Sequence, residues 1–92
     1  MKTLDLFYQN YCPYCEMAEK AIGELTKENE AYSAVTIHRI NENAERALAD
    51  SMDYWYVPTI YCEGEKLYEA SPRHSYNTIK ENVRKALDHA LR

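Results

Sequence analysis

Apolar residues recur along the chain with two spacings, one typical of strands and the other typical of helices. Residues 3–8 read Thr-Leu-Asp-Leu-Phe-Tyr, an alternating and largely apolar run that predicts a strand. Residues 13–28 carry apolar side chains three and four positions apart and begin with a proline, which suits the first position of a helix. The β-branched run at residues 34–40 predicts a second strand. Because a helix joins these two strands, we expect them to be parallel.

The second half of the chain predicts four more elements. A short helix is expected at about residues 43–52, packed through Ala44, Ala47, Leu48 and Met52. Residues 54–62 begin as a loop and become a third strand, and the pair 63–64, Glu-Gly, turns the chain into a fourth strand at 66–69. The helical apolar period returns at about 75–91. The order β-α-β-α-β-β-α predicts an α/β fold, with a mixed four-stranded sheet flanked by three helices that cover both faces.

Composition and charge limit the kinds of function. A chain of 92 residues is long enough for one domain, which we place at 1–92. Hydrophobic residues make up 46%, which predicts a packed core, and the net charge of −4 provides no basic surface for nucleic acid or for an anionic membrane. No targeting segment is recognisable, and no apolar run approaches the roughly 18 residues needed to cross a bilayer. We therefore expect a cytoplasmic monomer that binds neither nucleic acid nor membrane.

The clearest chemical motif is Cys12-Pro13-Tyr14-Cys15, which lies at the junction between the first predicted strand and the first predicted helix. Backbone N–H groups at the start of a helix are unpaired and stabilise a thiolate. A Cys-x-x-Cys pair beside a strand–helix–strand unit is typical of a redox dithiol. Cys12, ahead of the first turn, is the candidate attacking thiol, and Cys15, one turn inside the helix, is the candidate resolving thiol.

A structural zinc site is the main alternative for this motif. Four ligands would be needed, and the only further soft candidates are Cys62, His38, His74 and His89. None of them forms a second closely spaced pair. We therefore predict no metal ligands, and we expect Cys62 to be a buried bystander, as free cysteines commonly are.

Val57-Pro58-Thr59 is a second notable stretch, because proline rarely begins an apolar strand away from a sheet edge. A cis Val57–Pro58 bond is one explanation, and it would turn the Val57 backbone toward Cys12, where an extended substrate could pair with it. Aromatic residues close to both motifs, Tyr11 and Tyr14 above all, are candidates for the walls of a substrate groove. Trp55 and its tyrosine neighbours suit either a groove or ordinary packing.

These residues together resemble the glutaredoxins. Cys12-Pro13-Tyr14-Cys15 is similar to the dithiol glutaredoxin site, Val57-Pro58 resembles the cis-proline segment of the thioredoxin superfamily, and the element order agrees over essentially the whole chain. The resemblance implies a thioredoxin fold, a cis proline, and a thiol–disulfide oxidoreductase in which Cys12 is the nucleophile. It also implies that Val57 pairs through its backbone with the cysteine of glutathione. The substrate-binding residues expected on this basis are Tyr11, Pro13, Tyr14, Val57, Pro58 and Thr59.

Two positions depart from the glutaredoxin pattern. Gln9 stands where glutaredoxins usually have a lysine that meets a glutathione carboxylate, and Tyr68-Glu69-Ala70-Ser71 stands where they carry a Gly-Gly-x-Asp type stretch. We predict no tightly bound cofactor, with protein disulfides or glutathione mixed disulfides as substrates and either glutathione or a thioredoxin-type reductase as the source of electrons. The alternatives are an iron–sulfur cluster carrier that uses Cys12 and glutathione across a dimer, and a thioredoxin-like protein independent of glutathione. Tyr14 argues against the cluster, because cluster-binding members often have a smaller residue there.

Overall fold

A computed structural model describes residues 1–92 and shows a mixed four-stranded sheet with helices on both faces, as predicted. The strands are β1 (Leu4–Tyr8), β2 (Ile37–Asn41), β3 (Thr59–Cys62) and β4 (Glu65–Glu69), and the helices are α1 (Pro13–Glu28), the 3₁₀ turn η1 (Glu30–Ala34), α2 (Arg46–Asp50) and α3 (Tyr76–Leu91). In the sheet the order is β2-β1-β3-β4. β1 and β2 are parallel, whereas β1–β3 and β3–β4 are antiparallel.

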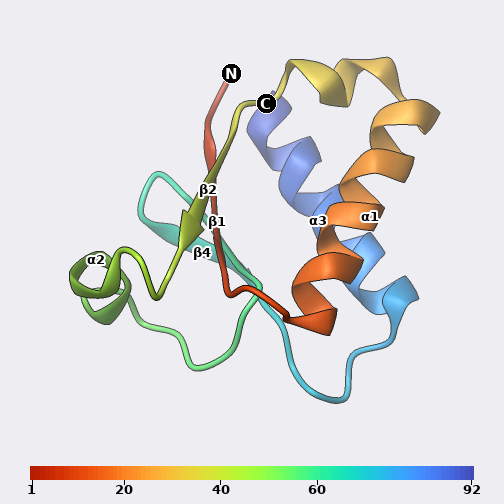
Figure 1. Ribbon diagram of the computed structural model, residues 1–92. Coiled ribbons are helices and arrows are strands. Elements are labelled where there is room, and N and C mark those ends of the chain that lie inside the picture. The colour runs from red at the N-terminus through yellow and green to blue at the C-terminus, as the bar shows by residue number, and fades with distance from the viewer.

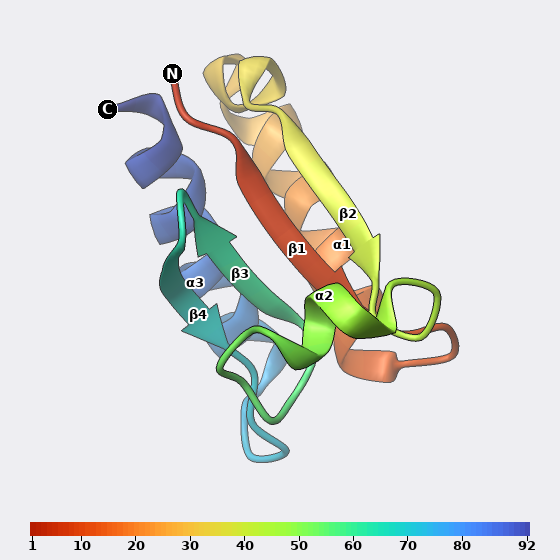
Figure 2. The ribbon, with the colours of Figure 1, turned by 90° about the vertical axis from the view of Figure 1, so that its left-hand side faces the viewer.

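Helices α1 and α3 lie side by side on one face of the sheet, and α2 lies on the other (Figures 1 and 2). The larger core fills the α1/α3 side and includes Leu6 of β1, Leu25 of α1 and Leu87 of α3. A smaller core on the α2 side contains Phe7, Ile40, Ala49 and Tyr61. Alternation along β1 explains this division, because Leu6 and Phe7 point to opposite faces of the sheet. None of the helices is long and apolar enough to cross a lipid bilayer.

Both long helices begin at residues suited to a helix start. Pro13 is the first residue of α1, where its missing N–H costs no hydrogen bond, and Cys12 is the N-cap. Ser75 caps α3, and its side chain accepts a hydrogen bond from the Thr78 N–H. The first helix therefore has the predicted bounds, and the last begins within one residue of the predicted start.

The second strand begins later than predicted, at Ile37 instead of residue 34, because η1 includes Ala34 and residues 35–36 form an irregular connection. The Asn29 side chain caps this turn by accepting a hydrogen bond from the Ala31 N–H. Tyr32 then turns its phenol to the Asp88 carboxylate of α3, and this hydrogen bond anchors the turn. The β-branched composition of the region did not reveal this bond, because its two partners lie 56 positions apart.

Helix α2 is shorter than predicted and packs through a different residue. The Asn41 side chain accepts hydrogen bonds from the Asn43 and Ala44 N–H groups, which makes a turn where a helix was expected. Of the predicted packing residues, Ala44, Ala47 and Leu48 are exposed, and Ala49 is buried in their place, whereas Met52 packs against the smaller core as predicted.

Candidate active site

The structure brings Cys12 and Cys15 together at the start of α1. The Cys15 N–H donates to Cys12 Sγ at 3.2 Å, so the sulfur of Cys12 caps the helix. All three cysteines of the chain are free thiols; Cys12 is partly exposed, whereas Cys15 is only 6% exposed. A partly exposed sulfur that receives a backbone hydrogen bond at a helix N-terminus is well placed to carry negative charge.

Burial is the first reason that the second thiol resists ionisation. It raises the pKa of Cys15 to about 12, with further contributions from the hydrogen bond with Cys12 and from the negative charges of Cys12 and Glu42. A backbone hydrogen bond from Gln9 opposes this rise. At neutral pH Cys15 is therefore a protonated thiol next to a more accessible one.

The Val57–Pro58 peptide bond is cis, as the resemblance implied, and it lies directly opposite the dithiol. The Cys12 thiol faces the Val57 carbonyl oxygen at 3.9 Å, which brings together residues 45 positions apart in the sequence. Neither the N–H nor the C=O of Val57 bonds to another backbone group. A free backbone donor and an acceptor that meets only the Cys12 thiol therefore lie beside the reactive sulfur, and an added strand would use both groups.

Two side chains of β4, Lys66 and Glu69, hold the loop before the cis proline. The Glu69 carboxylate accepts hydrogen bonds from the Trp55 and Tyr56 N–H groups, at 2.7 and 3.0 Å, and pairs with Lys66 Nζ at 2.8 Å. Lys66 Nζ also donates to the Asp53 carbonyl at 3.0 Å. Burial alone raises the pKa of Glu69, but the hydrogen bonds from Lys66, Trp55 and Tyr56 outweigh it and hold that pKa below its usual value.

A buried carboxylate behind the dithiol is the main feature that the sequence did not reveal. Glu42 follows β2 directly and is only 6% exposed. It accepts hydrogen bonds from the Tyr54 hydroxyl, at 2.6 Å, and from the side-chain amide of Gln9. Burial and this bond raise the pKa of Tyr54 well above its ordinary value. Gln9, at the position of the glutaredoxin lysine, is thus engaged in holding Glu42.

The predicted substrate-binding residues divide into exposed and buried ones. Tyr11, with a positive φ of 60°, is 97% exposed and directly precedes Cys12, and Pro13 is also exposed. Tyr14 is half-buried, and its hydroxyl donates to the Pro72 carbonyl at 2.9 Å. Pro58 and Thr59 are fully buried, so their side chains are not available to a substrate.

Thr59 instead stabilises the loop, because its hydroxyl donates to the Tyr56 carbonyl at 2.5 Å. The ring of Trp55 is 88% exposed, whereas Tyr54 packs against Phe7 in the smaller core. The packing interpretation therefore holds for Tyr54, whereas a groove role for Trp55 stays a prediction.

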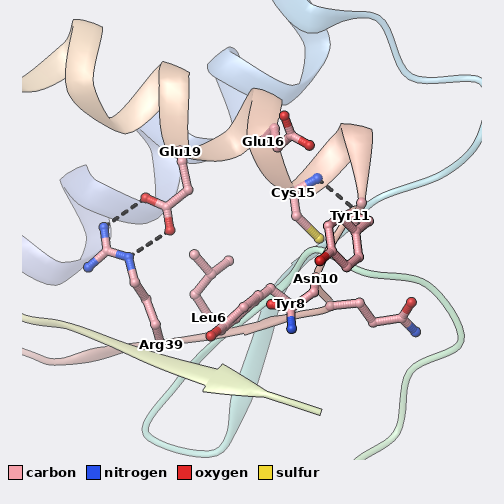
Figure 3. Close-up of a pocket in the computed structure, with 10 residues that line it drawn as sticks. Leu6, Tyr8, Asn10, Tyr11, Cys15, Glu16, Glu19 and Arg39 are labelled. Carbon is pink, nitrogen blue, oxygen red and sulfur yellow. Dashed lines mark hydrogen bonds and ion pairs between the residues drawn. The ribbon is translucent and has the colours of Figure 1, made fainter. Parts of the chain in front are cut away.

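Next to the dithiol is an open cavity of about 440 Å³ between α1 and the strands β1 and β2. Figure 3 shows the Cys15 sulfur pointing from α1 toward the strands, with Leu6 and Tyr8 below it. At the far end, Arg39 of β2 makes a two-point ion pair with Glu19 of α1, with N–O distances of 2.6 and 2.9 Å.

The remaining candidate ligands do not join the site. Cys62 is 2% exposed at the far end of β3, and burial raises its pKa. His74 bonds to the Tyr68 hydroxyl and His38 lies beside Asp5. The structure groups no three His, Cys, Asp or Glu side chains in an arrangement that could hold a metal ion.

Comparison with known proteins agrees with this architecture. No known protein family and no curated protein matches the sequence. Thioredoxin 1 of Thermosipho africanus is 13% identical over 98% of this chain and 99% of its own, with a TM-score of 0.59. Mitochondrial thioredoxin 3 of Saccharomyces cerevisiae is 16% identical over 91% and 77%, with a TM-score of 0.61. A thioredoxin-like protein of Clostridium perfringens is 28% identical over 92% and 70%, with a TM-score of 0.56. The chain therefore has the thioredoxin fold.

Proposed function

We propose that this thioredoxin-fold protein is a thiol–disulfide oxidoreductase that reduces disulfides through Cys12 and Cys15. The observation that carries the proposal is the position of Cys12 Sγ, which is partly exposed, receives the Cys15 N–H at 3.2 Å and faces the Val57 carbonyl. An accessible sulfur at a helix N-terminus with a second thiol one turn away is the minimal machinery for disulfide exchange.

The different environments of the two thiols give them separate roles. The Cys12 thiolate attacks one sulfur of the substrate, forms a mixed disulfide and releases the other sulfur as a thiol. Cys15 then loses its proton and attacks Cys12 Sγ, which releases the second substrate thiol and leaves a Cys12–Cys15 disulfide. The substrate gains two electrons and the dithiol loses two, so an external thiol must restore the reduced protein.

The order of these steps follows from what raises the pKa of Cys15. After burial, the next cause is the hydrogen bond with Cys12, and the Cys12 charge adds to it. Both disappear once Cys12 Sγ is bonded to the substrate sulfur. Formation of the mixed disulfide thus makes the second thiol easier to deprotonate at the moment when it is needed.

Protein disulfides are the substrates that the surroundings of Cys12 favour. The N–H and C=O of Val57, which have no backbone partner, suit an extended chain that places its cysteine at Cys12. The positions that would meet glutathione are already engaged, because Gln9 bonds to Glu42 and Glu69 bonds to the Trp55 and Tyr56 N–H groups. Recycling by a thioredoxin-type reductase is therefore the first expectation, and recycling by glutathione is the second.

Reduction of insulin with dithiothreitol as the electron source tests the proposal. We expect catalysis by the wild type, none by Cys12→Ser, and full activity in Cys62→Ser, the matched control. Undiminished catalysis by Cys12→Ser would contradict the proposed function. NADPH consumption, measured with thioredoxin reductase or with glutathione and its reductase, then identifies the electron donor.

A further inference from the structure

The charged side chains that line the cavity beside the dithiol are more acidic than basic. Two acidic residues of α1, Glu16 and Glu19, and one basic residue of β2, Arg39, line it. Arg39 is paired with Glu19 through two hydrogen bonds, from Nε and Nη2, at 2.6 and 2.9 Å. Glu16 is an exposed lining residue, and Figure 3 draws no hydrogen bond or ion pair to its carboxylate. The one ionic group at this cavity that is free to meet a ligand is therefore negative.

The other walls suit an amphipathic side chain. Leu6 and the ring of Tyr8 lie on the strand side of the cavity, and the ring of Tyr11 lies beside the dithiol (Figure 3). A cation with a hydrocarbon stem can lay the stem on such surfaces and keep its charge at the rim, and aromatic ring faces also attract cations. An anion would have to displace Glu19 from Arg39 and would meet Glu16, so the lining disfavours it.

The cavity also lies where a substrate must pass. Cys12 and Cys15 both line it, and Val57 lies on the opposite side of the dithiol. At about 440 Å³ it falls within the size range of ligand clefts. A polypeptide whose cysteine is at Cys12 can therefore place a neighbouring side chain in this cavity.

From these observations we infer that the cavity is a specificity site for a lysine or arginine side chain that lies close to the disulfide of a substrate polypeptide. This inference rests on the proposed function, because the occupant belongs to a disulfide substrate. It adds that the enzyme prefers disulfides with a positive charge about one side chain away from the sulfur.

Three small disulfides of similar shape and different charge test the preference. They are cystamine, which is cationic, hydroxyethyl disulfide, which is neutral, and dithiodipropionate, which is anionic. We expect kcat/KM to fall in that order. Glu16→Gln should lower the ratio of cystamine to hydroxyethyl disulfide about three- to fivefold, the effect of one exposed ion pair. A general effect of the variant on the reactivity of Cys12 changes kcat/KM for both substrates equally and therefore cancels in this ratio.

The paired residues give predictions of opposite sign. Arg39→Gln frees the Glu19 carboxylate, so the preference for cystamine should rise, whereas Glu19→Gln frees Arg39, so it should fall or reverse. Glu30→Gln is the control, because it removes the same charge roughly 20 Å away, beyond the other end of α1. The inference is overturned if the three disulfides react alike or if the variants leave the ratio unchanged.

A further experiment distinguishes a polypeptide occupant from a small cationic molecule, and another distinguishes failure of this inference from failure of the proposed function. Peptide disulfides with lysine next to the cysteine should have a higher kcat/KM than those with norleucine there. A preference for cystamine without a preference for the lysine peptide contradicts a polypeptide occupant.

If no disulfide is reduced catalytically, the proposed function fails, and charged methanethiosulfonates still test the cavity. In Cys15→Ser, Cys12 forms a disulfide with the reagent and releases methanesulfinate. The cationic reagent should react fastest, and equal rates would overturn the inference.

Discussion

Glu69 should control both the stability of the protein and the use of its substrate, because it fixes the loop that carries Val57. In Glu69→Ala the Trp55 and Tyr56 N–H groups lose a charged acceptor that now lies at 2.7 and 3.0 Å. A hydrogen bond to a charged group contributes about 1.5 kcal/mol at the low end of the usual range. Because the two bonds are partly open to water, we expect a loss of about 2–3 kcal/mol of unfolding free energy.

The same change should weaken catalysis through the substrate and leave the thiols intact. Once the loop is free, the position of the Val57 carbonyl opposite Cys12 Sγ, now 3.9 Å away, must be ordered again for each substrate. Ordering one residue costs about 1 kcal/mol or more, so kcat/KM for insulin should fall roughly fivefold to tenfold, mainly through KM. Alkylation of Cys12 by iodoacetamide should keep its rate.

Urea unfolding and insulin reduction measure these effects, and Glu65→Ala is the matched control. Glu65 is an exposed glutamate of the same strand that makes no side-chain hydrogen bond in the structure, so its loss should change stability by less than about 0.5 kcal/mol. Glu69→Gln keeps one acceptor oxygen and should fall between the two. If Glu69→Ala unfolds and reacts like Glu65→Ala, the loop does not depend on this carboxylate.

The lowered pKa of Glu69 also predicts how its contribution depends on pH. A carboxylate whose folded pKa lies below its ordinary value of 4.5 stabilises the fold above that value, and the contribution disappears as the pH falls through the lowered pKa. The stability difference between wild type and Glu69→Gln should therefore be constant from neutral pH down to about 5 and then shrink. A difference that grows on acidification would refute the reasoning.

Two further predictions concern the thiols and the start of α1. Iodoacetamide at pH 8 should modify Cys12 in the folded protein and spare Cys15 and Cys62, because burial raises the pKa of both, to about 12 for Cys15; peptide mass spectrometry that finds Cys15 modified before unfolding would contradict this. Tyr14→Phe removes the hydroxyl that donates to the Pro72 carbonyl at 2.9 Å, so urea unfolding should show a loss of about 0.5–1.5 kcal/mol, and an unchanged midpoint would show that the bond contributes nothing.

Features coded by local sequence could be predicted closely. Pro13 at the first helical position and the serine at position 75 determine where the two long helices begin, and both starts agree with the structure to within a residue. The proximity of Cys12 to Cys15 follows from their spacing on one helical turn. The cis form of Val57–Pro58 needed the family resemblance, because spacing alone left it open.

Features that depend on distant partners were missed. Glu42 looks like an ordinary polar residue between two asparagines, and its burial depends on partners elsewhere: the Tyr54 hydroxyl, the Gln9 amide and the Arg46 guanidinium. The cavity likewise needs Arg39 of β2 and Glu19 of α1 to meet across 20 residues. Hydrophobic pattern and secondary-structure propensity carry no information about contacts between residues distant in the sequence. The later start of β2, at Ile37, was missed for the same reason, because it depends on the hydrogen bond from Tyr32 to Asp88.

The central claim is that Cys12 is the sulfur that attacks a substrate disulfide. It is tested most directly by trapping the mixed disulfide in Cys15→Ser, with native insulin, whose disulfide bonds are intact, as substrate. Peptide mass spectrometry then locates the bond. The account predicts a stable adduct on Cys12 in Cys15→Ser and no adduct in Cys12→Ser. An adduct on Cys15 in Cys12→Ser, or on Cys62 in either variant, would contradict it.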